Sequence, residues 1–232
     1  MVGVMSIGIL GGTGPAGQAL AVRLASVDEQ VLLGSRQAER AALIAAELSG
    51  KWPEHRLAID GVVNEDACRA DLVVIATPWE GAPPLAASLR NHLEGKVLVS
   101  MVNALERVGT ELQALMPPRG SIAVAVQQAA PGALVAGAFH HVPARGLADL
   151  AAPLDADVLV CSDHAEATAA TIDLVSCLPG CRGIDAGSLS AAAAIEAFTA
   201  VLIGINVKHR VHASIRLTGL DGVGGGVGTI ST

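Results

Sequence analysis

Short apolar runs alternate with longer amphipathic stretches along most of the chain. The continuous apolar run Asp71–Ala76 is typical of a parallel strand buried on both faces, whereas Gln37–Leu48 carries its charges on one side, as a surface helix does. Strands that alternate with helices build βαβ units around a parallel sheet. The pattern therefore predicts an α/β protein with a doubly wound, mostly parallel sheet and a small helical C-terminal part.

The predicted elements begin and end where these patterns change. The expected strands are Met5–Leu10, Gln30–Gly34, Leu57–Val62, Asp71–Ala76, Lys96–Val102, Leu134–Phe139, Asp157–Val160 and Gly183–Asp185. The expected helices are Pro15–Ser26, Gln37–Leu48, Asn64–Cys68, Ala165–Leu178 and one long or kinked helix from Ser190 to about Ile215.

A glycine-rich turn follows the first predicted strand and opens the first predicted helix. It reads Gly12-Thr13-Gly14-Pro15-Ala16-Gly17, a GxGxxG spacing. Gly12 permits the tight bend, Gly14 lets the backbone approach a pyrophosphate, and Gly17 lets the helix pack closely. The helix N-terminus supplies free N–H groups and a partial positive charge. An ordinary glycine-rich turn is the alternative, but this context favours a Rossmann-type dinucleotide-binding domain.

The end of the second predicted strand indicates which dinucleotide binds. Domains specific for NAD carry Asp or Glu there, about 20 residues after the glycines, to accept from the ribose 2′-OH. This chain instead has Ser35 and Arg36, with Arg40 four residues further along the same helix face. A hydroxyl and two guanidinium groups form a cradle for a 2′-phosphate. The sequence predicts NADP rather than NAD; the alternative is a solvated basic helix start.

Two further loops are expected beside the cofactor, because ligands of this fold bind beyond the carboxyl ends of the strands. Thr77 and Pro78 end the fourth strand, and Pro78 is expected to pack on the cofactor. Val102 ends the fifth strand, and its backbone is expected to face the nicotinamide. Trp79 fits equally well as a capping hydrophobic residue and as a cofactor contact.

Composition narrows the class of function. The net charge is −7 and no basic stretch is present, so nucleic-acid binding is not expected. The four cysteines have neither CxxC nor zinc-site spacing, which favours reduced thiols in a cytoplasmic protein without a metal site.

The apolar run Ala191–Val207 is interpreted as a buried helix rather than a membrane span, because it contains Glu196 and Asn206. It is too apolar to stand alone, which predicts packing on its own domain or in a homodimer. Arg216, beyond this run, is expected to be solvated.

Six segments taken together resemble one family. They are GGTGPAG (Gly11–Gly17), GSRQAER (Gly34–Arg40), TPWEG (Thr77–Gly81), FHHVPA (Phe139–Ala144), DVLVCSD (Asp157–Asp163) and IDAGSLS (Ile184–Ser190). In this order they make the chain similar to NADPH-dependent coenzyme F420 reductases, also called F420-dependent NADP reductases. The resemblance implies reversible hydride transfer between NADP(H) and the deazaflavin coenzyme F420, with the two rings stacked face to face in one cleft.

The resemblance also implies which residues hold each cofactor. NADP would contact Thr13, Gly14, Pro15, Ala16, Ser35, Arg36 and Arg40, with Thr77, Pro78 and Val102 beside its adenosine or nicotinamide half. The deazaflavin would contact His140, Val142, Pro143 and Leu202. No catalytic nucleophile is expected, because the cofactors carry the reactivity. An N–H of His140 would orient the deazaflavin; the alternative is a histidine satisfied by backbone at a strand end.

Two other functions stay open. A reductase could use NADP for another small acceptor, such as an imine, a keto acid or a ferric chelate, and a non-catalytic sensor could bind NADP without turnover. In each case residues 1–187 are expected to form an NADP-binding Rossmann-type domain. Residues 188–220 are expected to form a C-terminal helical segment for the cleft and dimer packing, and residues 221–232 a flexible glycine-rich tail.

Overall fold

The computed structural model describes residues 5–220; residues 1–4 and 221–232, which include the predicted tail, lie outside the described part. The strands are β1 (Ser6–Leu10), β2 (Gln30–Ser35), β3 (Ile59–Val63), β4 (Leu72–Ile75), β5 (Val97–Ser100), β6 (Leu105–Val108), β7 (Glu111–Ala114), β8 (Leu134–Gly137), β9 (Ala156–Ser162) and β10 (Cys181–Asp185). The helices are α1 (Pro15–Ala25), α2 (Ala38–Lys51), α3 (Asn64–Ala67), α4 (Ala82–Ser88), α5 (Ile122–Ala129), α6 (Ala144–Ala148), α7 (Ala165–Ser176) and α8 (Ala192–His209), with 3₁₀ turns η1 (Trp79–Gly81) and η2 (Leu189–Ala191).

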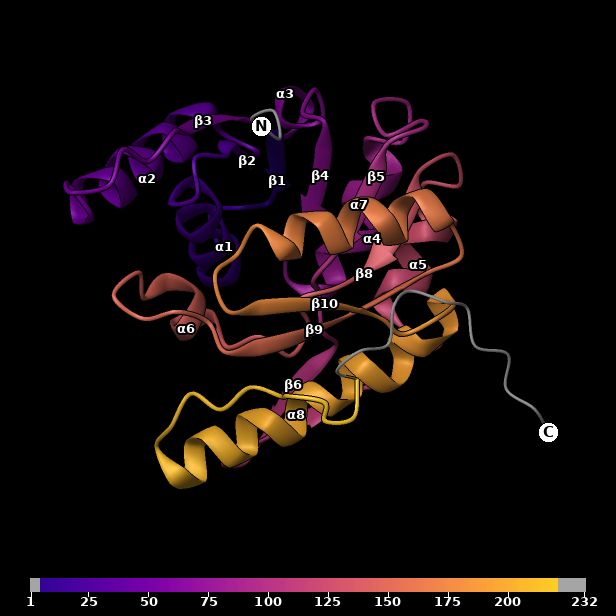
Figure 1. The fold of residues 1–232 in the computed structure, drawn as a ribbon. Coiled ribbons are helices and arrows are strands. Elements are labelled where there is room, and N and C mark those ends of the chain that lie inside the picture. The colour runs from indigo at the N-terminus through magenta and orange to yellow at the C-terminus, as the bar shows by residue number, and fades with distance from the viewer. Residues whose placement is uncertain (1–4, 221–232) are drawn as a thin grey trace.

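One eight-stranded sheet forms the centre of the fold, with helices on both faces (Figure 1). Its strand order is β10-β9-β8-β5-β4-β1-β2-β3. Neighbouring strands are parallel except β8 and β9, which pair antiparallel. The predicted Rossmann-type, doubly wound and mostly parallel sheet is therefore confirmed.

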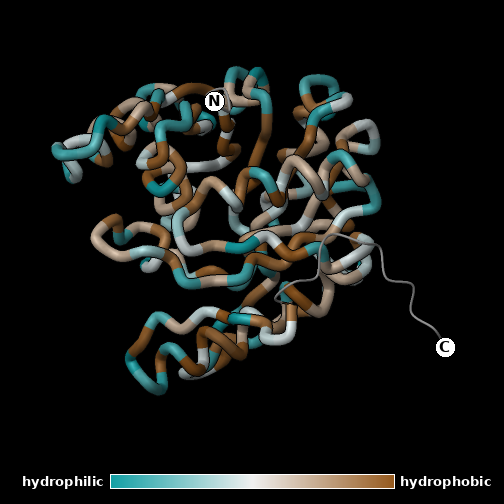
Figure 2. The backbone as a smooth tube through the Cα atoms, viewed as in Figure 1, coloured by the Kyte–Doolittle hydropathy of each residue, from teal (hydrophilic) through white to brown (hydrophobic). Residues whose placement is uncertain are grey.

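The sheet separates two apolar layers, as the two-residue repeat of a strand requires. In β4, Leu72 and Val74 pack on the layer that contains α1 and α7, whereas Val73 and Ile75 pack on the layer that contains α4 and α5. The hydrophobic colour in Figure 2 accordingly runs along the central strands. A strand buried on both faces needs a continuous apolar run, which is why the sequence pattern located β4 correctly.

Helix α8 is shorter than predicted. It ends at His209, because Arg210 adopts the left-handed conformation (φ 55°) and ends the helical hydrogen-bonding pattern. The Asn206 side chain then exchanges two hydrogen bonds with the backbone of Ala213, which fixes the chain as it turns back. The predicted continuation of this helix to Ile215 is wrong.

The inner side of α8 is anchored by two polar residues. The Glu196 carboxylate accepts hydrogen bonds from the backbone N–H groups of Ile122 and Ala123, at 2.9 and 3.0 Å, and so caps the N-terminus of α5. Burial raises the pKa of Glu196 to about 7, although these two hydrogen bonds oppose the shift. One turn further on, the Thr199 hydroxyl donates to the carbonyl of His140. These bonds attach α8 to the sheet and to α5.

The outer side of α8 is apolar and exposed. Phe198, Val201 and Ile205 are 40, 53 and 39% exposed and lie on one face of the helix, so this face does not pack on its own domain and, of the two predicted modes of packing, only contact with another subunit stays open for it. Hydrophobic colour covers much of α8 in Figure 2. In the described part of the chain, the helical stretch Leu189–His209 is long and apolar enough to cross a membrane, judged by length and composition alone, and 28% of its apolar 18-residue window is buried.

Strand β8 pairs with only part of β9, and other groups hydrogen-bond to the rest of that edge. On β9, only Cys161 and Ser162 pair with β8, because the chain turns away at Phe139 in the left-handed region (φ 61°). Further back along β9, the N–H of Leu159 donates to the His141 ring, and the N–H of Asp157 donates to the carbonyl of Ile215. A side chain and the segment that follows α8 thus satisfy backbone groups that would otherwise be buried unpaired.

The same segment is held by a buried carboxylate. The Asp157 side chain is fully buried and accepts hydrogen bonds from Arg182, from Arg216 and from the N–H of Leu217. The Arg182 hydrogen bonds hold the pKa of Asp157 well below its usual range. Arg216 also pairs with the exposed Asp155; the residue is exposed, as predicted, but its guanidinium is held in ion pairs. This network attaches the C-terminal segment to β9.

Substituting Asp157→Asn should lower the free energy of unfolding by about 2 kcal/mol, because the buried amide NH₂ would face N–H donors where a carboxylate oxygen now accepts hydrogen bonds. Asp155→Asn is the matched control, since its side chain is 80% exposed and pairs with the same Arg216. The control should cost less than about 1 kcal/mol. Urea titrations of the variants measure both effects, and equal losses would contradict the proposed role of burial.

Candidate functional site

A groove opens at the carboxyl ends of β1, β2 and β4. Its volume is about 1080 Å³, enough for a ligand of dinucleotide size. Seven of the residues predicted to bind NADP line it together: Thr13, Gly14, Ser35, Arg36, Arg40, Thr77 and Pro78. The parallel strands bring these residues together because their carboxyl ends meet at one edge of the sheet.

The glycine turn packs tightly against its surroundings. A Cβ added to Gly17 would lie 2.6 Å from the Cα of Gly12, so α1 can approach the turn only without a side chain there. Gly11, just before the predicted motif, has φ +63°, and its Cβ would lie 2.2 Å from Thr77 Cγ2. The Gln18 amide donates to the carbonyl of Thr13 and holds the turn from the helix side.

The N-terminus of α1 is open to an anion. Gly14 provides no side-chain cap, and the first turn of the helix contains no acidic residue. The nearest atom to a Cβ on Gly14 would be 3.9 Å away, so the space above this residue is empty. Unpaired N–H groups and the positive end of the helix dipole at this point fit a pyrophosphate.

The basic side of the groove lies at the end of β2. The Ser35 hydroxyl accepts a hydrogen bond from the N–H of Gln37 and closes the turn into α2. Arg36 and Arg40 are exposed, and within the described residues neither guanidinium has a hydrogen-bond or ion-pair partner. Two unpaired guanidinium groups beside a hydroxyl fit a phosphate monoester.

Helix α4 forms a wall of the groove that the sequence analysis did not predict. Pro84, Leu85 and Ser88 line the groove together with Arg36 and Arg40. An apolar wall in a groove with guanidinium groups suits a flat purine ring. Proline in the first turn of a helix was the sequence signal that could have located α4 at Ala82–Ser88.

Most of the residues expected to contact the deazaflavin are buried, and α8 contacts the loop that contains His140. Val102 and His140 follow β5 and β8, and the Asn103 amide joins the two loops by donating to the His140 carbonyl at 2.9 Å. Val102, His140, Val142 and Leu202 are 4, 3, 8 and 5% exposed, while Pro143 is half-buried. This half of the carboxyl edge is therefore roofed, in contrast to the open groove over β1, β2 and β4.

Several polar atoms under this roof lack partners within the described part of the chain. They are Nδ1 of His141, the Ser100 hydroxyl and both ring nitrogens of His140, whose ring interacts with the Val102 backbone but makes no hydrogen bond of good geometry. Burial, helped by the neighbouring His141, lowers the pKa of His140 to about 3, and burial lowers the pKa of His141 to about 4. Both rings are thus neutral near pH 7. Buried polar atoms without partners are rare in proteins and fit a place where a polar ligand is bound.

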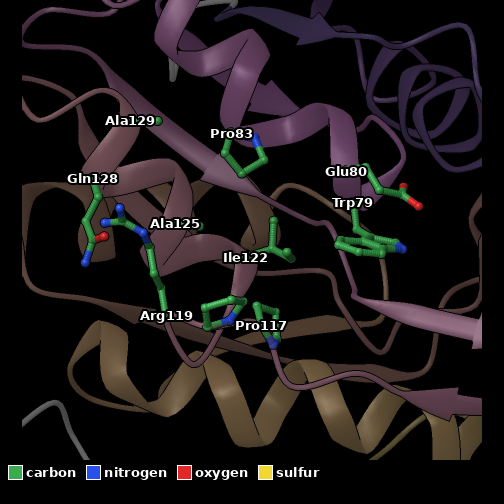
Figure 3. Close-up of a pocket in the computed structure, with 10 residues that line it drawn as sticks. Trp79, Glu80, Pro83, Pro117, Arg119, Ile122, Ala125, Gln128 and Ala129 are labelled. Carbon is green, nitrogen blue, oxygen red and sulfur yellow. The ribbon is translucent and has the colours of Figure 1, made fainter.

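Trp79 faces a second cavity of about 320 Å³ rather than the groove. Figure 3 shows Trp79 and Pro83 on one side of this cavity and Pro117 and Ile122 on another. Segment η1–α4 separates the two spaces, because its Pro83 lines the cavity and its Pro84 lines the groove. A structural role for Trp79 is the better interpretation. Among the described residues, no three His, Cys, Asp or Glu side chains are grouped so as to hold a metal ion.

Sequence comparisons match this chain to one family of known proteins. The sequence profile of a family described as NADP oxidoreductase coenzyme F420-dependent matches residues 6–104. The F420-dependent NADP reductase of Methanocaldococcus jannaschii is 37% identical over 223 residues, which cover 94% of this chain and 100% of that protein. The F420-dependent NADP reductase of Methanothermobacter thermautotrophicus is 35% identical over 226 residues, covering 94% and 96%.

A solved structure also matches this fold. The crystal structure of a candidate F420-dependent NADP reductase from Arthrobacter sp. FB24 matches this fold with a TM-score of 0.76. It is 27% identical in sequence, and the match covers 90% of this chain and 97% of that chain.

The two depressed histidine pKa values predict how stability depends on pH. In the unfolded chain both imidazoles take up a proton below about pH 6.5, whereas the folded protein keeps them neutral. Their contribution to stability is therefore present above that pH and is lost as the pH falls toward about 4 for His141 and about 3 for His140. His141→Gln, which retains an acceptor for the Leu159 N–H, should make the stability loss between pH 6.5 and 4.5 shallower by about 1.4 kcal/mol per pH unit.

Denaturant titrations at several pH values measure this slope. His209→Gln is the control, because His209 is exposed at the end of α8 and its removal should leave the slope unchanged. A slope in His141→Gln equal to that of the wild type would contradict the neutral state of the buried ring.

Proposed function

The chain belongs to the family of coenzyme F420-dependent NADP oxidoreductases, and we propose that its two cofactors meet along the carboxyl edge of the sheet. It is an enzyme whose activity is hydride transfer between NADP(H) and coenzyme F420. When both cofactors are bound, their rings supply the hydride donor and acceptor. The protein's own contribution is then to bind and orient the rings and to exclude water.

The unpaired guanidinium groups of Arg36 and Arg40 carry the proposal for NADP. With the Ser35 hydroxyl, they hold the 2′-phosphate, which distinguishes NADP from NAD. The glycine turn from Gly12 to Gly17, including Thr13, Pro15 and Ala16, presents the N-terminus of α1 to the pyrophosphate. Thr77 and Pro78 lie beside the remainder of the dinucleotide, and the backbone of Val102 faces the nicotinamide.

The deazaflavin is proposed to bind against His140, Val142, Pro143 and Leu202. Pro143 is the half-buried member of this set, and contact with the others requires the covering segments to shift. The neutral His140 ring donates one N–H to an acceptor on the deazaflavin, where negative charge develops during reduction. Because its pKa is about 3, His140 does not serve as a proton donor near pH 7.

The outer face of α8 is proposed to form a homodimer interface. Phe198, Val201 and Ile205 present a continuous apolar stripe there, while Glu196 and Thr199 attach the opposite side of the helix to the same domain. A helix anchored in this way is part of the folded domain, which supports a second copy of the chain as partner rather than a membrane. The net charge of −7 argues against nucleic acid as a partner. The four free cysteines support a cytoplasmic location.

Mixing the protein with NADPH and oxidised F420 should bleach the absorbance of the oxidised deazaflavin. In Arg36→Ala, KM for NADPH should rise about thirtyfold, because a charge-assisted hydrogen bond worth about 2 kcal/mol is lost. The KM for NADH should change less than threefold, since NADH lacks the phosphate. Steady-state kinetics with each dinucleotide measure the ratio.

Arg145→Ala is a suitable control, because Arg145 is also an exposed arginine but lies on α6, outside the groove. It should leave both KM values unchanged. Equal losses for NADPH and NADH in Arg36→Ala would refute the 2′-phosphate assignment. An absence of bleaching in the wild type at every pH would refute F420 as the acceptor.

The dimer interface predicts a change in molecular mass. Phe198→Asp should convert a dimer into a monomer at micromolar concentration, because a charge placed in an apolar interface would lose its hydration. Val207→Asp is the control, since Val207 is 70% exposed but lies on another side of α8. Sedimentation velocity measures the mass of each variant, and a monomeric wild type would rule out this interface.

A further inference from the structure

Asn64 lies where the glycine turn, the end of β2 and the groove meet. It is the first residue of α3, directly after β3, and only 4% of it is exposed, yet it lines the groove. Its Oδ1 accepts a hydrogen bond of 3.0 Å from the N–H of Gly11. Gly34 leaves room for this amide, because a Cβ at that position would lie 2.8 Å from the same oxygen.

The orientation of the Asn64 amide follows from its partner. A backbone N–H can only donate, so the amide oxygen must face Gly11 and the NH₂ group must point elsewhere. Within the described residues this NH₂ group has no hydrogen-bond partner, but it is not sealed from solvent as the ring nitrogens of His140 are. Asn64 is among the residues that line the groove, and its NH₂ group is the end of the side chain left free to reach that space.

The two N–H bonds of the Asn64 NH₂ group require a hydrogen-bond acceptor. An amide in a nearly buried position loses most of its hydration, and it regains that free energy only through a hydrogen bond. The phosphate oxygens and ribose hydroxyls of a dinucleotide are such acceptors. Asn64 lies between Gly11, next to the pyrophosphate position, and Gly34, which directly precedes Ser35 and Arg36.

We propose that Asn64 is a positioning residue for the dinucleotide. Its Oδ1 holds the glycine turn in the shape that receives the pyrophosphate, and its NH₂ group donates to an oxygen of the bound dinucleotide. This inference rests on the proposed function, in that NADP occupies the groove. The oxygen that accepts this hydrogen bond lies in the part of the dinucleotide that NADP and NAD share, whereas Arg36 binds the 2′-phosphate that only NADP carries.

The variant Asn64→Asp separates the two roles of the side chain. It keeps an oxygen for the Gly11 N–H but has no donor, while Asn64→Ala loses both. In Asn64→Asp the melting temperature without ligand should fall by no more than in Asn64→Ala, because the carboxylate still accepts from the Gly11 N–H, and the dissociation constants for NADPH and NADH should both rise about tenfold or more. At saturating NADPH and F420 its kcat should stay within about twofold of the wild type, because Asn64 acts in binding and not in the hydride step.

Gln37→Glu is the matched control for the added negative charge. It makes the same change from amide to carboxylate on another residue that lines the groove, next to Arg36. Repulsion of the 2′-phosphate should weaken NADPH in this variant more than NADH, in contrast to the parallel loss in Asn64→Asp. Fluorescence titration of each purified variant with each dinucleotide gives the four dissociation constants.

Dissociation constants in Asn64→Asp within twofold of the wild type would overturn the proposal. So would a loss of affinity accompanied by a melting temperature below that of Asn64→Ala and a lower kcat, which would indicate a structural role alone. A wild-type protein that binds NADPH but does not reduce F420 would refute only the proposed acceptor, because the dissociation constants test Asn64 without F420. A wild type that binds neither dinucleotide would overturn both.

Discussion

The close approach of α1 to the glycine turn is the contact on which the site depends. With no side chain on Gly17, the helix backbone rests against Gly12, and the N-terminus of α1 points at the carboxyl edge of the sheet. Other groups of the groove are placed relative to that point: Thr77 packs on Gly11, and Asn64 holds the N–H of the same residue. A single added methyl group at Gly17 would therefore displace the anion-binding end of the helix.

The carboxyl edge of the sheet is divided into two unlike halves. Over β1, β2 and β4 it is an open groove with unpaired donors, which is already shaped for a polyanionic ligand. Over β5 and β8 it is roofed by α8, which Glu196 and Thr199 attach to α5 and to the His140 loop. The polar atoms of Ser100 and His140 are enclosed under that roof without partners. One half of the site is thus preformed, and the other half is closed over its candidate residues.

The roof depends in turn on the reversed direction of β9. Because β8 and β9 are antiparallel and pair over only two residues, the remaining edge of β9 is free to receive the His141 ring and the backbone of Ile215. The buried Asp157 then ties that returning segment to Arg182 and Arg216. The same contacts that complete the sheet therefore also hold the segment that follows α8 against β9.

Local sequence patterns were enough to predict the strands of the large sheet and most residues of the open groove. The strands β1, β2 and β4, the glycine turn and the Ser35-Arg36 pair all act through constraints that neighbouring residues impose, such as burial of apolar runs, missing Cβ atoms and helix N-termini. Application of the carboxyl-end rule to β3 as well would also have indicated Asn64. In this part of the molecule, sequence spacing is enough to predict which residues lie close together in space.

The sequence by itself determined the fold class, the glycine turn and the basic residues of the groove. Only the tertiary structure decided that α4 forms a wall of the groove, that Arg216 is paired, that one face of α8 is exposed and that His140 is enclosed. Each of these depends on contacts between residues far apart in sequence, such as Thr199 with His140 and Arg216 with Asp157. Whether a side chain is buried or paired depends on residues that are close in space but distant in sequence, and a local sequence pattern does not identify those residues.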